Sequence, residues 1–407
     1  MFKIYQLKEN KKLKIFFDMA INLLGTGVGL AVLNLLIYPN MAKSIGTGMY
    51  GQMQSFMAIV YIVCGTLGTS LCSTRLILNY DYEHKKLKGD FNYILLVSLL
   101  ACVVIVLLAL FKAGEKNLLN FLLVSFIGIL NCLSNYFIVG LRLHINYGAI
   151  FISKILGCLG YFAGFFFFKF TEKWHFVFIC ASIFELFYYM LNTNLANEPF
   201  IKTIMFRKTI KTYTNLNISA FLNKSLSYID KILLYPLLGG QAVTIYYVAS
   251  IFGKIVIMTI EPITNVILSY LAKEKNVSKK VWKKYIVISL SSCIVMFFLC
   301  NIISAPVIKY LYPQWYILAV TYVPICTFCL IVSAFINLIN PLTLKTFEVS
   351  KQIFINGAGT VIYCMIFFLF YETYGILGCC YALIASHSIR LLLITMFCLR
   401  SFKDAKY

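Results

Sequence analysis

Charged side chains inside otherwise apolar stretches are the residues of this sequence that could do chemistry. The densest group lies in NISAFLNKSLSYIDKILLYP (217–236). Its polar members, spaced at i, i+4, i+7 and i+8 with one lysine alongside, are Asn223, Ser227, Asp230, Lys231 and Lys224. Helical spacing places such residues on one stripe. Because lipid cannot satisfy polar groups, the stripe is expected to face a wet interior.

Three further stretches repeat this pattern. The next apolar stretch carries Ser250, Lys254, Glu261 and Asn265 at i, i+4, i+11 and i+15, and two others carry Glu185, Tyr189 and Asn192, and His387 with Arg390. A purely structural interpretation stays open: Asp230 could pair with Lys254 or Lys231, and Glu261 with Lys224. His387 alone is typical of a neutral buried imidazole, whereas Lys154 and Arg390 could extend to the membrane surface.

The balance of these charges predicts the chemistry. A charge at the centre of a membrane costs about 2.5–3.5 kcal/mol, so such residues are functional candidates. Five are basic and three are acidic, and this surplus suits an anion such as a phosphate or diphosphate. The predicted substrate-binding residues are Lys224, Lys231, Lys254 and Arg390. The predicted polar or ion-coupling residues are Asp230, Glu261, Glu185, Asn223, Asn265 and His387.

Composition identifies the elements that must position these residues. Of 407 residues, 61% are hydrophobic and 13% charged, and the mean hydropathy is +0.84. Soluble domains are about 45–50% apolar and about 25% charged, so the chain is predicted to be an all-α, polytopic membrane protein. Stretches of about 20 apolar residues can span a bilayer. Twelve occur, at 16–37, 52–74, 91–111, 118–140, 149–170, 175–195, 213–238, 243–269, 285–305, 317–340, 353–371 and 376–399.

Basic residues in the connections predict the orientation. Twenty-five Lys and Arg fall on one side of the predicted membrane and six on the other. The positive-inside rule therefore puts both termini in the cytoplasm and accounts for the net charge of +21 without nucleic acid. An even number of spans preserves this alternation.

An internal duplication organises the spans. LLIYPNMAKSIGTGMYGQMQSF (35–56) resembles ILLYPLLGGQAVTIYYVASIF (232–252), with Tyr38-Pro39 matching Tyr235-Pro236 and Tyr50 matching Tyr246. In both, a span is expected to end at Tyr-Pro, followed by a glycine-containing turn. The repeat predicts two parallel six-helix bundles, 1–205 and 206–407, which in such proteins enclose a midplane cavity and work by alternating access.

Enzyme motifs do not occur in the sequence. There is no P-loop, G-x-S-x-G, H-E-x-x-H or strand-associated G-x-G-x-x-G, so neither an enzyme nor a cofactor is predicted. Cys326 and Cys329 form a C-x-x-C pair without a second pair or His nearby, so no metal site is predicted.

Two stretches carry a resemblance to a known family. YPNMAKSIGTGMYGQMQSFMAIV (38–60) and SYIDKILLYPLLGGQAVTIYYVASIFGKI (227–255) resemble the polysaccharide transporter family, the Wzx-type oligosaccharide flippases of the multidrug/oligosaccharidyl-lipid/polysaccharide exporter superfamily. The pattern in the second is carried by Asp230, Lys231, Gly239, Gly240, Tyr246 and Ala249. The resemblance implies a bacterial inner-membrane flippase for undecaprenyl-diphosphate-linked oligosaccharides of O-antigen, capsule or exopolysaccharide, with H⁺ or Na⁺ as the candidate coupling ion. It also implies a polysaccharide polymerase machinery as partner.

Two alternatives remain at this stage. One is a cation-coupled multidrug antiporter of the same superfamily, whose cavity should be acidic. The other is a membrane polysaccharide polymerase or ligase, which would be expected to carry catalytic groups on a large outward loop, whereas the outward connections here are short.

Overall fold

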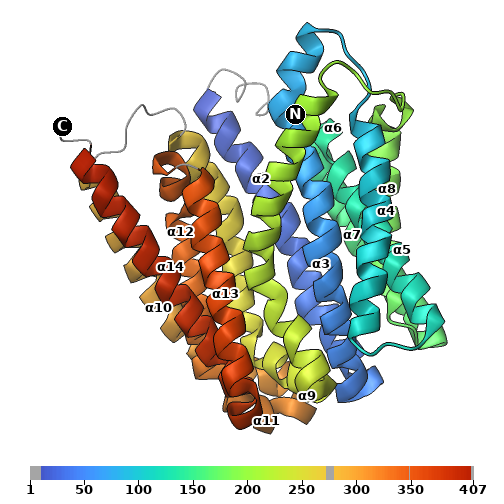
Figure 1. Ribbon diagram of the computed structural model, residues 1–407. Helices are drawn as coiled ribbons and strands as arrows, with labels where there is room; N and C mark the ends of the chain where they lie inside the picture. The colour runs from blue at the N-terminus through green and yellow to red at the C-terminus, as the bar shows by residue number, and fades with distance from the viewer. Residues whose placement is uncertain (1–10, 272–278, 348, 405–407) are drawn as a thin grey trace. The chain divides into compact units, whose positions relative to one another are not determined.

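The computed structural model describes residues 11–271, 279–347 and 349–404, and within these ranges the chain is helical and has no strand (Figure 1). The elements are α2 (Lys11–Ala31), η1 (Val32–Ile37), α3 (Tyr38–His84), α4 (Phe91–Lys112), α5 (Leu118–Phe137), α6 (Val139–Leu143), α7 (Tyr147–Thr171), α8 (His175–Asn192), η2 (Leu195–Asn197), α9 (Phe206–Leu271), α10 (Lys279–Leu311), η3 (Pro313–Trp315), α11 (Tyr316–Val320), α12 (Val323–Thr346), α13 (Val349–Tyr374) and α14 (Ile376–Asp404).

Ten continuous segments of the described chain are long and apolar enough to cross a membrane. One of them, Ala20–His84, has 65 residues. At 1.5 Å per residue it would extend about 100 Å, more than three times the hydrocarbon thickness of about 30 Å. It is broken at Gly46, and α9, which has 66 residues and contains the segment Ser227–Ile260, is broken at Gly239. Two segments therefore each supply two crossings, which confirms the predicted twelve-span, all-α fold.

Glycine is required at both breaks. Gly46 has φ 74° and ψ 170°, and Gly239 has φ 81° and ψ 173°. This region of backbone conformation is accessible almost only to glycine. Two equivalent glycines with the same conformation agree with the predicted duplication, although the sequence offset between them is 193 residues rather than 196 or 197.

The first break falls later than expected. The sequence predicted a span ending at residue 37, before Tyr38-Pro39, but the helix continues through this pair to Gly46. Pro39 lacks an N–H group, and its ring crowds the carbonyl group four residues before it. The preceding segment η1 is a π-helix, whose wider hydrogen-bonding spacing accommodates the proline without ending the helix.

Packing divides the chain into two compact units. Unit 1 comprises Met1–Met41 and Ser55–Lys224, and unit 2 comprises Ala42–Gln54 and Ser225–Tyr407. This division follows packing, whereas the predicted bundles 1–205 and 206–407 follow the sequence repeat. The boundary of the bundles at residues 205 and 206 therefore stays a prediction. Each broken helix forms a hairpin. Residues 42–54, the tip of the hairpin broken at Gly46, belong to unit 2, together with residues 225–271 of the hairpin broken at Gly239.

Unit 1 is built on the hairpin of α7 and α8, with α2 against α7 and α5 against α8. The two hairpin helices approach closely at Gly160 and Gly164, where an added Cβ would meet the backbone of α8. Small residues allow such contacts between membrane helices. In unit 2, α13 pairs with α14 and α12 packs on both α10 and α14. Its apolar core includes Ile336, Ile355 and Ile394.

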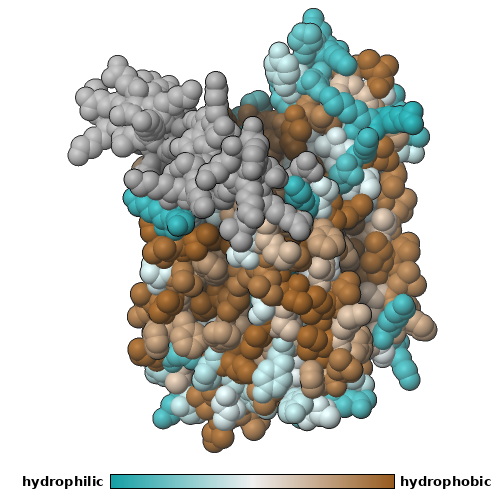
Figure 2. All heavy atoms as spheres, turned by 60° about the vertical axis from the view of Figure 1, so that its left-hand side comes forward, coloured by the Kyte–Doolittle hydropathy of each residue, from teal (hydrophilic) through white to brown (hydrophobic). Residues whose placement is uncertain are grey.

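The outer faces of the helices are apolar. On α10, Val287, Phe298 and Ile302 are 65%, 59% and 71% exposed. Figure 2 shows one face on which apolar atoms fill the middle, with hydrophilic atoms above and below. This is the surface expected against lipid hydrocarbon rather than water. The chain is a multi-pass membrane protein.

Candidate functional site: a lysine–aspartate cluster in unit 2

The break at Gly239 brings charged residues of α9 together. Asp230 and Lys231 lie before the break and Lys254 lies after it, so the reversal of the chain places residues 24 positions apart in contact. The first hairpin contributes a neutral partner, Gln54, which lies after its own break at Gly46. We call Gln54, Asp230, Lys231, Tyr246, Tyr247 and Lys254 the lysine–aspartate cluster.

Close backbone packing within unit 2 fixes the tip of the first hairpin, residues 42–54, against the second hairpin. The Thr244 hydroxyl group donates a hydrogen bond of 2.7 Å to the carbonyl oxygen of Thr47. A Cβ added to Gly51 would collide with the backbone of Gly240, and one added to Gly240 would collide with Gly48. Glycine at these positions therefore permits the approach that carries Gln54 to the charged residues.

Lys231 is buried, with 6% of its surface exposed. Its Nζ donates a hydrogen bond of 2.8 Å to Gln54 Oε1 and lies 4.5 Å from the centre of the Tyr247 ring. Gln54 is oriented in turn, because its Nε2 donates to the Tyr50 hydroxyl group at 3.2 Å. The amide dipole and the aromatic face both stabilise an ammonium group away from water.

Asp230 pairs with Lys254, one of the two partners that the sequence allowed. Lys254 Nζ lies 3.3 Å from Asp230 Oδ2 and 4.9 Å from the centre of the Tyr246 ring. Asp230 Oδ1 accepts a hydrogen bond of 2.9 Å from the backbone N–H of Lys231. The side chains of Asp230 and Lys254 are only 3% and 14% exposed, so the pair is largely removed from water.

The cluster has two lysines and one aspartate, a formal charge of +1. Buried charge of one sign is costly, and a negatively charged group with several acceptor oxygens would offset that cost. Two ammonium groups, which together carry six N–H donors, can bind such a group. The arrangement is therefore suited to holding an anion.

A further cation of unit 2 lies on the α13–α14 hairpin. Arg390 is 5% exposed, so the expectation that it extends to the membrane surface is wrong. Its side-chain carbons lie on Gly359, and its Nη2 donates a hydrogen bond of 2.8 Å to Asn356 Oδ1. Within the described ranges it forms no ion pair. His387, one turn earlier, is 2% exposed and stays a candidate polar residue.

Two predicted residues lie in unit 1 instead. Glu185 on α8 pairs with Lys154 on α7 at 2.9 Å, so Lys154 also does not extend to the surface. Lys224 packs over Gly65 of α3, with its Nζ 3.1 Å from where a Cβ would stand. The structure thus separates the predicted set into the lysine–aspartate cluster, the Arg390 position and these two positions of unit 1.

The remaining predicted residues are Asn223, Glu261 and Asn265, whose side chains lie outside the described residues, as does the alternative pair of Lys224 with Glu261. Ser227, assigned to the same stripe as Asp230, is exposed, so the stripe is not one buried face. Sequence reasoning missed Gln54, a neutral amide one turn after Tyr50, because no signal in the sequence pairs it with Lys231.

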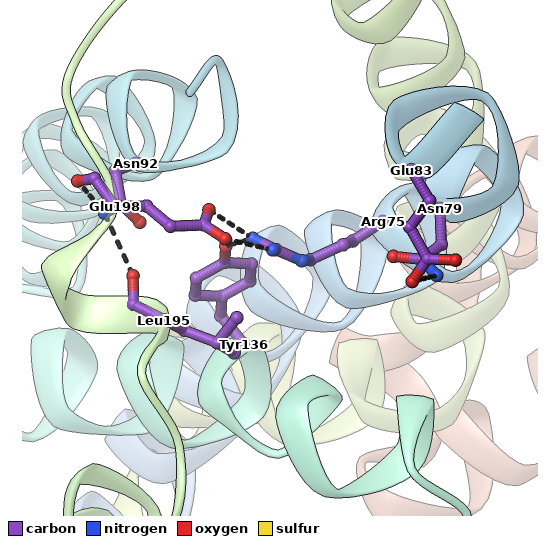
Figure 3. A network of polar contacts seen from close by, with 7 residues as sticks. All are labelled: Arg75, Asn79, Glu83, Asn92, Tyr136, Leu195 and Glu198. Carbon is purple, nitrogen blue, oxygen red and sulfur yellow. Dashed lines mark hydrogen bonds and ion pairs between the residues drawn. The ribbon is translucent and has the colours of Figure 1, made fainter. Parts of the chain in front are cut away.

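Sequence reasoning also missed a buried network in unit 1. Arg75, one of the 25 basic residues that the sequence placed in connections, donates from both terminal nitrogens to the carboxylate of Glu198 and, from Nη1, to the Tyr136 hydroxyl group at 2.9 Å (Figure 3). Arg75 is 9% exposed. The sequence offered no periodicity that links the end of α3 to a connection 123 residues later.

Comparisons with known proteins agree with the fold. No family model and no curated protein matches the chain. Among solved structures, the lipid II flippase MurJ in an inward closed conformation matches with TM-score 0.67 at 15% identity, over 96% of this chain and 87% of that one. An inward-facing multidrug resistance MATE family transporter of the MOP superfamily matches with TM-score 0.63 at 13% identity, over 95% and 96%. A Vibrio cholerae MATE transporter matches with TM-score 0.62 at 12% identity, over 95% and 97%. The chain has the fold of these transporters.

Proposed function

We propose that the protein is a flippase that moves undecaprenyl-diphosphate-linked oligosaccharides, the repeat units of O-antigen, capsule or exopolysaccharide, across the bacterial inner membrane by alternating access. The observation that carries the proposal is the buried positive charge of unit 2. Lys231, Lys254 and Arg390 contribute three cations, and Asp230 contributes one carboxylate. A diphosphate is the part of such a lipid that requires cations inside a membrane.

The lysine–aspartate cluster supplies specific roles. Lys231 and Lys254 donate hydrogen bonds to phosphate oxygens, while Gln54 keeps the Lys231 ammonium group in place before the anion arrives. Asp230 holds Lys254 through a single contact of 3.3 Å, which an incoming phosphate can replace. The displaced carboxylate is then the candidate site for H⁺ or Na⁺ coupling.

The fold supports the same proposal. One of the matching structures is a lipid II flippase. The protein would reside in the inner membrane with both termini in the cytoplasm, and a polysaccharide polymerase would receive the translocated product.

Export of surface glycan tests the proposal. In a strain lacking the protein, K231Q and K254Q variants should restore little or no surface glycan at normal protein level, and lipid-linked oligosaccharide should accumulate. Lys309, an exposed residue of α10 in the same unit, offers a matched control, and K309Q should restore export. Full export by the K231Q/K254Q double variant would refute the role of the cluster.

A multidrug antiporter is the second candidate, because two of the structures above are MATE transporters. A cationic drug would need a carboxylate shielded from water, and the structure offers the buried Asp230 and the half-buried Glu185. Each is paired with a lysine, which favours an anionic substrate. Drug-resistance profiles of the deletion strain separate the candidates: lost resistance with intact surface glycan would favour the antiporter.

A further inference from the structure

The connection between α8 and α9, residues 193–205, is held in place from its inner side. The carboxylate of Glu198 receives the two-pronged contact from Arg75 shown in Figure 3. Asn92 of α4 donates from Nδ2 to the carbonyl oxygens of Leu195 and Glu198, at 3.1 and 2.8 Å. Paired arginine–carboxylate contacts fix orientation as well as distance. The first half of the connection therefore has one defined path.

A second set of contacts holds the other half. The backbone N–H of Asp90 donates to the carbonyl oxygen of Ile201 at 2.7 Å, and Asp90 Oδ1 accepts from the backbone N–H of Thr203 at 2.7 Å. The Tyr82 hydroxyl group donates to Asp90 Oδ2 at 2.5 Å, and Asp90 is fully buried. These contacts leave the backbone of residues 195–203 little freedom to turn its outer side chains inward.

The outer side of this fixed connection is apolar. Phe200, Ile201 and Ile204 are 62%, 55% and 83% exposed. Three large apolar side chains within five residues are costly in water, by about 25 cal/mol for each Å² that could be buried. The connection lies at the end of unit 1 that the Lys and Arg distribution predicts to be cytoplasmic.

Cations stand beside these apolar side chains. Lys202 Nζ lies 4.5 Å from the centre of the Tyr93 ring and 5.2 Å from that of Phe206, and both rings hold its ammonium group in place. Arg207 and Lys211 are exposed and one turn apart at the start of α9. Among the ion pairs of the described residues, none involves these three cations.

We propose that this surface, formed by Phe200, Ile201, Lys202, Ile204, Arg207 and Lys211 and here called the interfacial loop, docks anionic phospholipids of the cytoplasmic leaflet. The apolar side chains insert at the boundary of headgroups and acyl chains, and the three cations contact lipid phosphates. Burial of apolar side chains and attraction between cations and anionic lipids act together in segments that lie on membranes. The assignment is independent of the transported substrate.

Fluorescence quenching by brominated lipid tests the assignment in the full-length protein. An F200W variant is reconstituted in vesicles of equal phosphatidylcholine and phosphatidylglycerol, in which one lipid or the other is brominated near the headgroup. The parent protein supplies the background from the three native tryptophans. Quenching of Trp at position 200 should be stronger when phosphatidylglycerol carries the bromine. A local enrichment of phosphatidylglycerol over phosphatidylcholine of about fivefold corresponds to the binding free energy that one basic residue usually contributes near an anionic surface.

Charge-matched variants identify the cause of that preference. In the F200W background, K202Q/R207Q/K211Q should bring the two quenching values to equality. K85Q/K86Q/K88Q removes three lysines from the connection between α3 and α4 and should leave the preference unchanged. Equal quenching in the F200W parent, absence of quenching by either lipid, or equal losses in the two triple variants would each overturn the proposal.

Discussion

Replacing Asp230 with Asn tests whether the lysine–aspartate cluster is a coupled electrostatic unit. At 3.3 Å and an effective dielectric constant of about 20, the attraction between Asp230 and Lys254 is about 5 kcal/mol before desolvation. Removing one partner of a buried pair leaves the other charge uncompensated and typically costs about 3–5 kcal/mol. Because D230N also leaves Lys231 close by, we expect the free energy of unfolding to fall by about 4 kcal/mol.

The double variant D230N/K254Q removes both charges of the pair. Its loss of stability should be smaller than the sum of the two single losses by about 1–3 kcal/mol, because the second substitution relieves the unpaired ammonium group left by the first. Thermal and denaturant unfolding of purified protein in one detergent measures all four members of the cycle. Export of glycan should fail in the double variant even where its stability recovers, since an anion-binding cation is lost.

A surface pair calibrates the cycle. Asp81 and Lys208 are 2.6 Å apart, but their side chains are 37% and 59% exposed. Exposed ion pairs contribute about 0.2–1 kcal/mol to stability. The loss of stability in D81N/K208Q should therefore be close to the sum of the losses in D81N and K208Q. If the losses of stability in D230N and K254Q also added within about 0.5 kcal/mol, Asp230 and Lys254 would not be coupled and the cluster would not be one electrostatic unit.

Three further substitutions test other parts of the structure. G239A should lower the free energy of unfolding by about 1–3 kcal/mol, because a φ of 81° and a ψ of 173° are accessible almost only to glycine. G27A, which adds a methyl group in open space within α2, should leave stability unchanged or raise it. The unfolding midpoints of the two variants make the comparison. R75Q should raise hydrogen exchange of residues 193–205 by at least about tenfold, the equivalent of 1.4 kcal/mol, with little change in α13, as measured by mass spectrometry. G359L should displace Arg390, whose Cδ would lie 2.7 Å from an added Cβ, and should reduce glycan export more than it reduces protein level.

The number and type of elements could be predicted because composition and loop charge report on the membrane directly. Twelve crossings followed from apolar length and from the alternation of Lys and Arg, and both depend on local sequence. The end of the first crossing could not be placed, because Tyr38-Pro39 has the residue types of a helix end. A π-helical segment before Pro39 permits the helix to continue, and no residue type specifies that segment in advance.

The chemistry of the candidate site was partly visible. Helical spacing singled out Asp230 and Lys231, and the next span contributed Lys254, since all three interrupt apolar runs. Gln54 could not be assigned as a partner of Lys231, because the two are 177 positions apart and a neutral amide does not stand out at a predicted helix start. Arg75 was assigned to a loop because the predicted span ended at residue 74. In the structure α3 continues ten residues further, to His84.

The two hairpins of the repeat are equivalent in backbone but unequal in charge, and this inequality bears on the proposed function. Both are broken by a glycine with nearly the same φ and ψ, so duplication accounts for the geometry. The second hairpin alone carries Asp230, Lys231 and Lys254, whereas the first supplies the amide of Gln54. Within unit 2, the tip of the first hairpin, residues 42–54, adds a neutral amide to the charges of the second hairpin, so the lysine–aspartate cluster keeps the formal charge of +1 on which the proposed binding of a diphosphate depends.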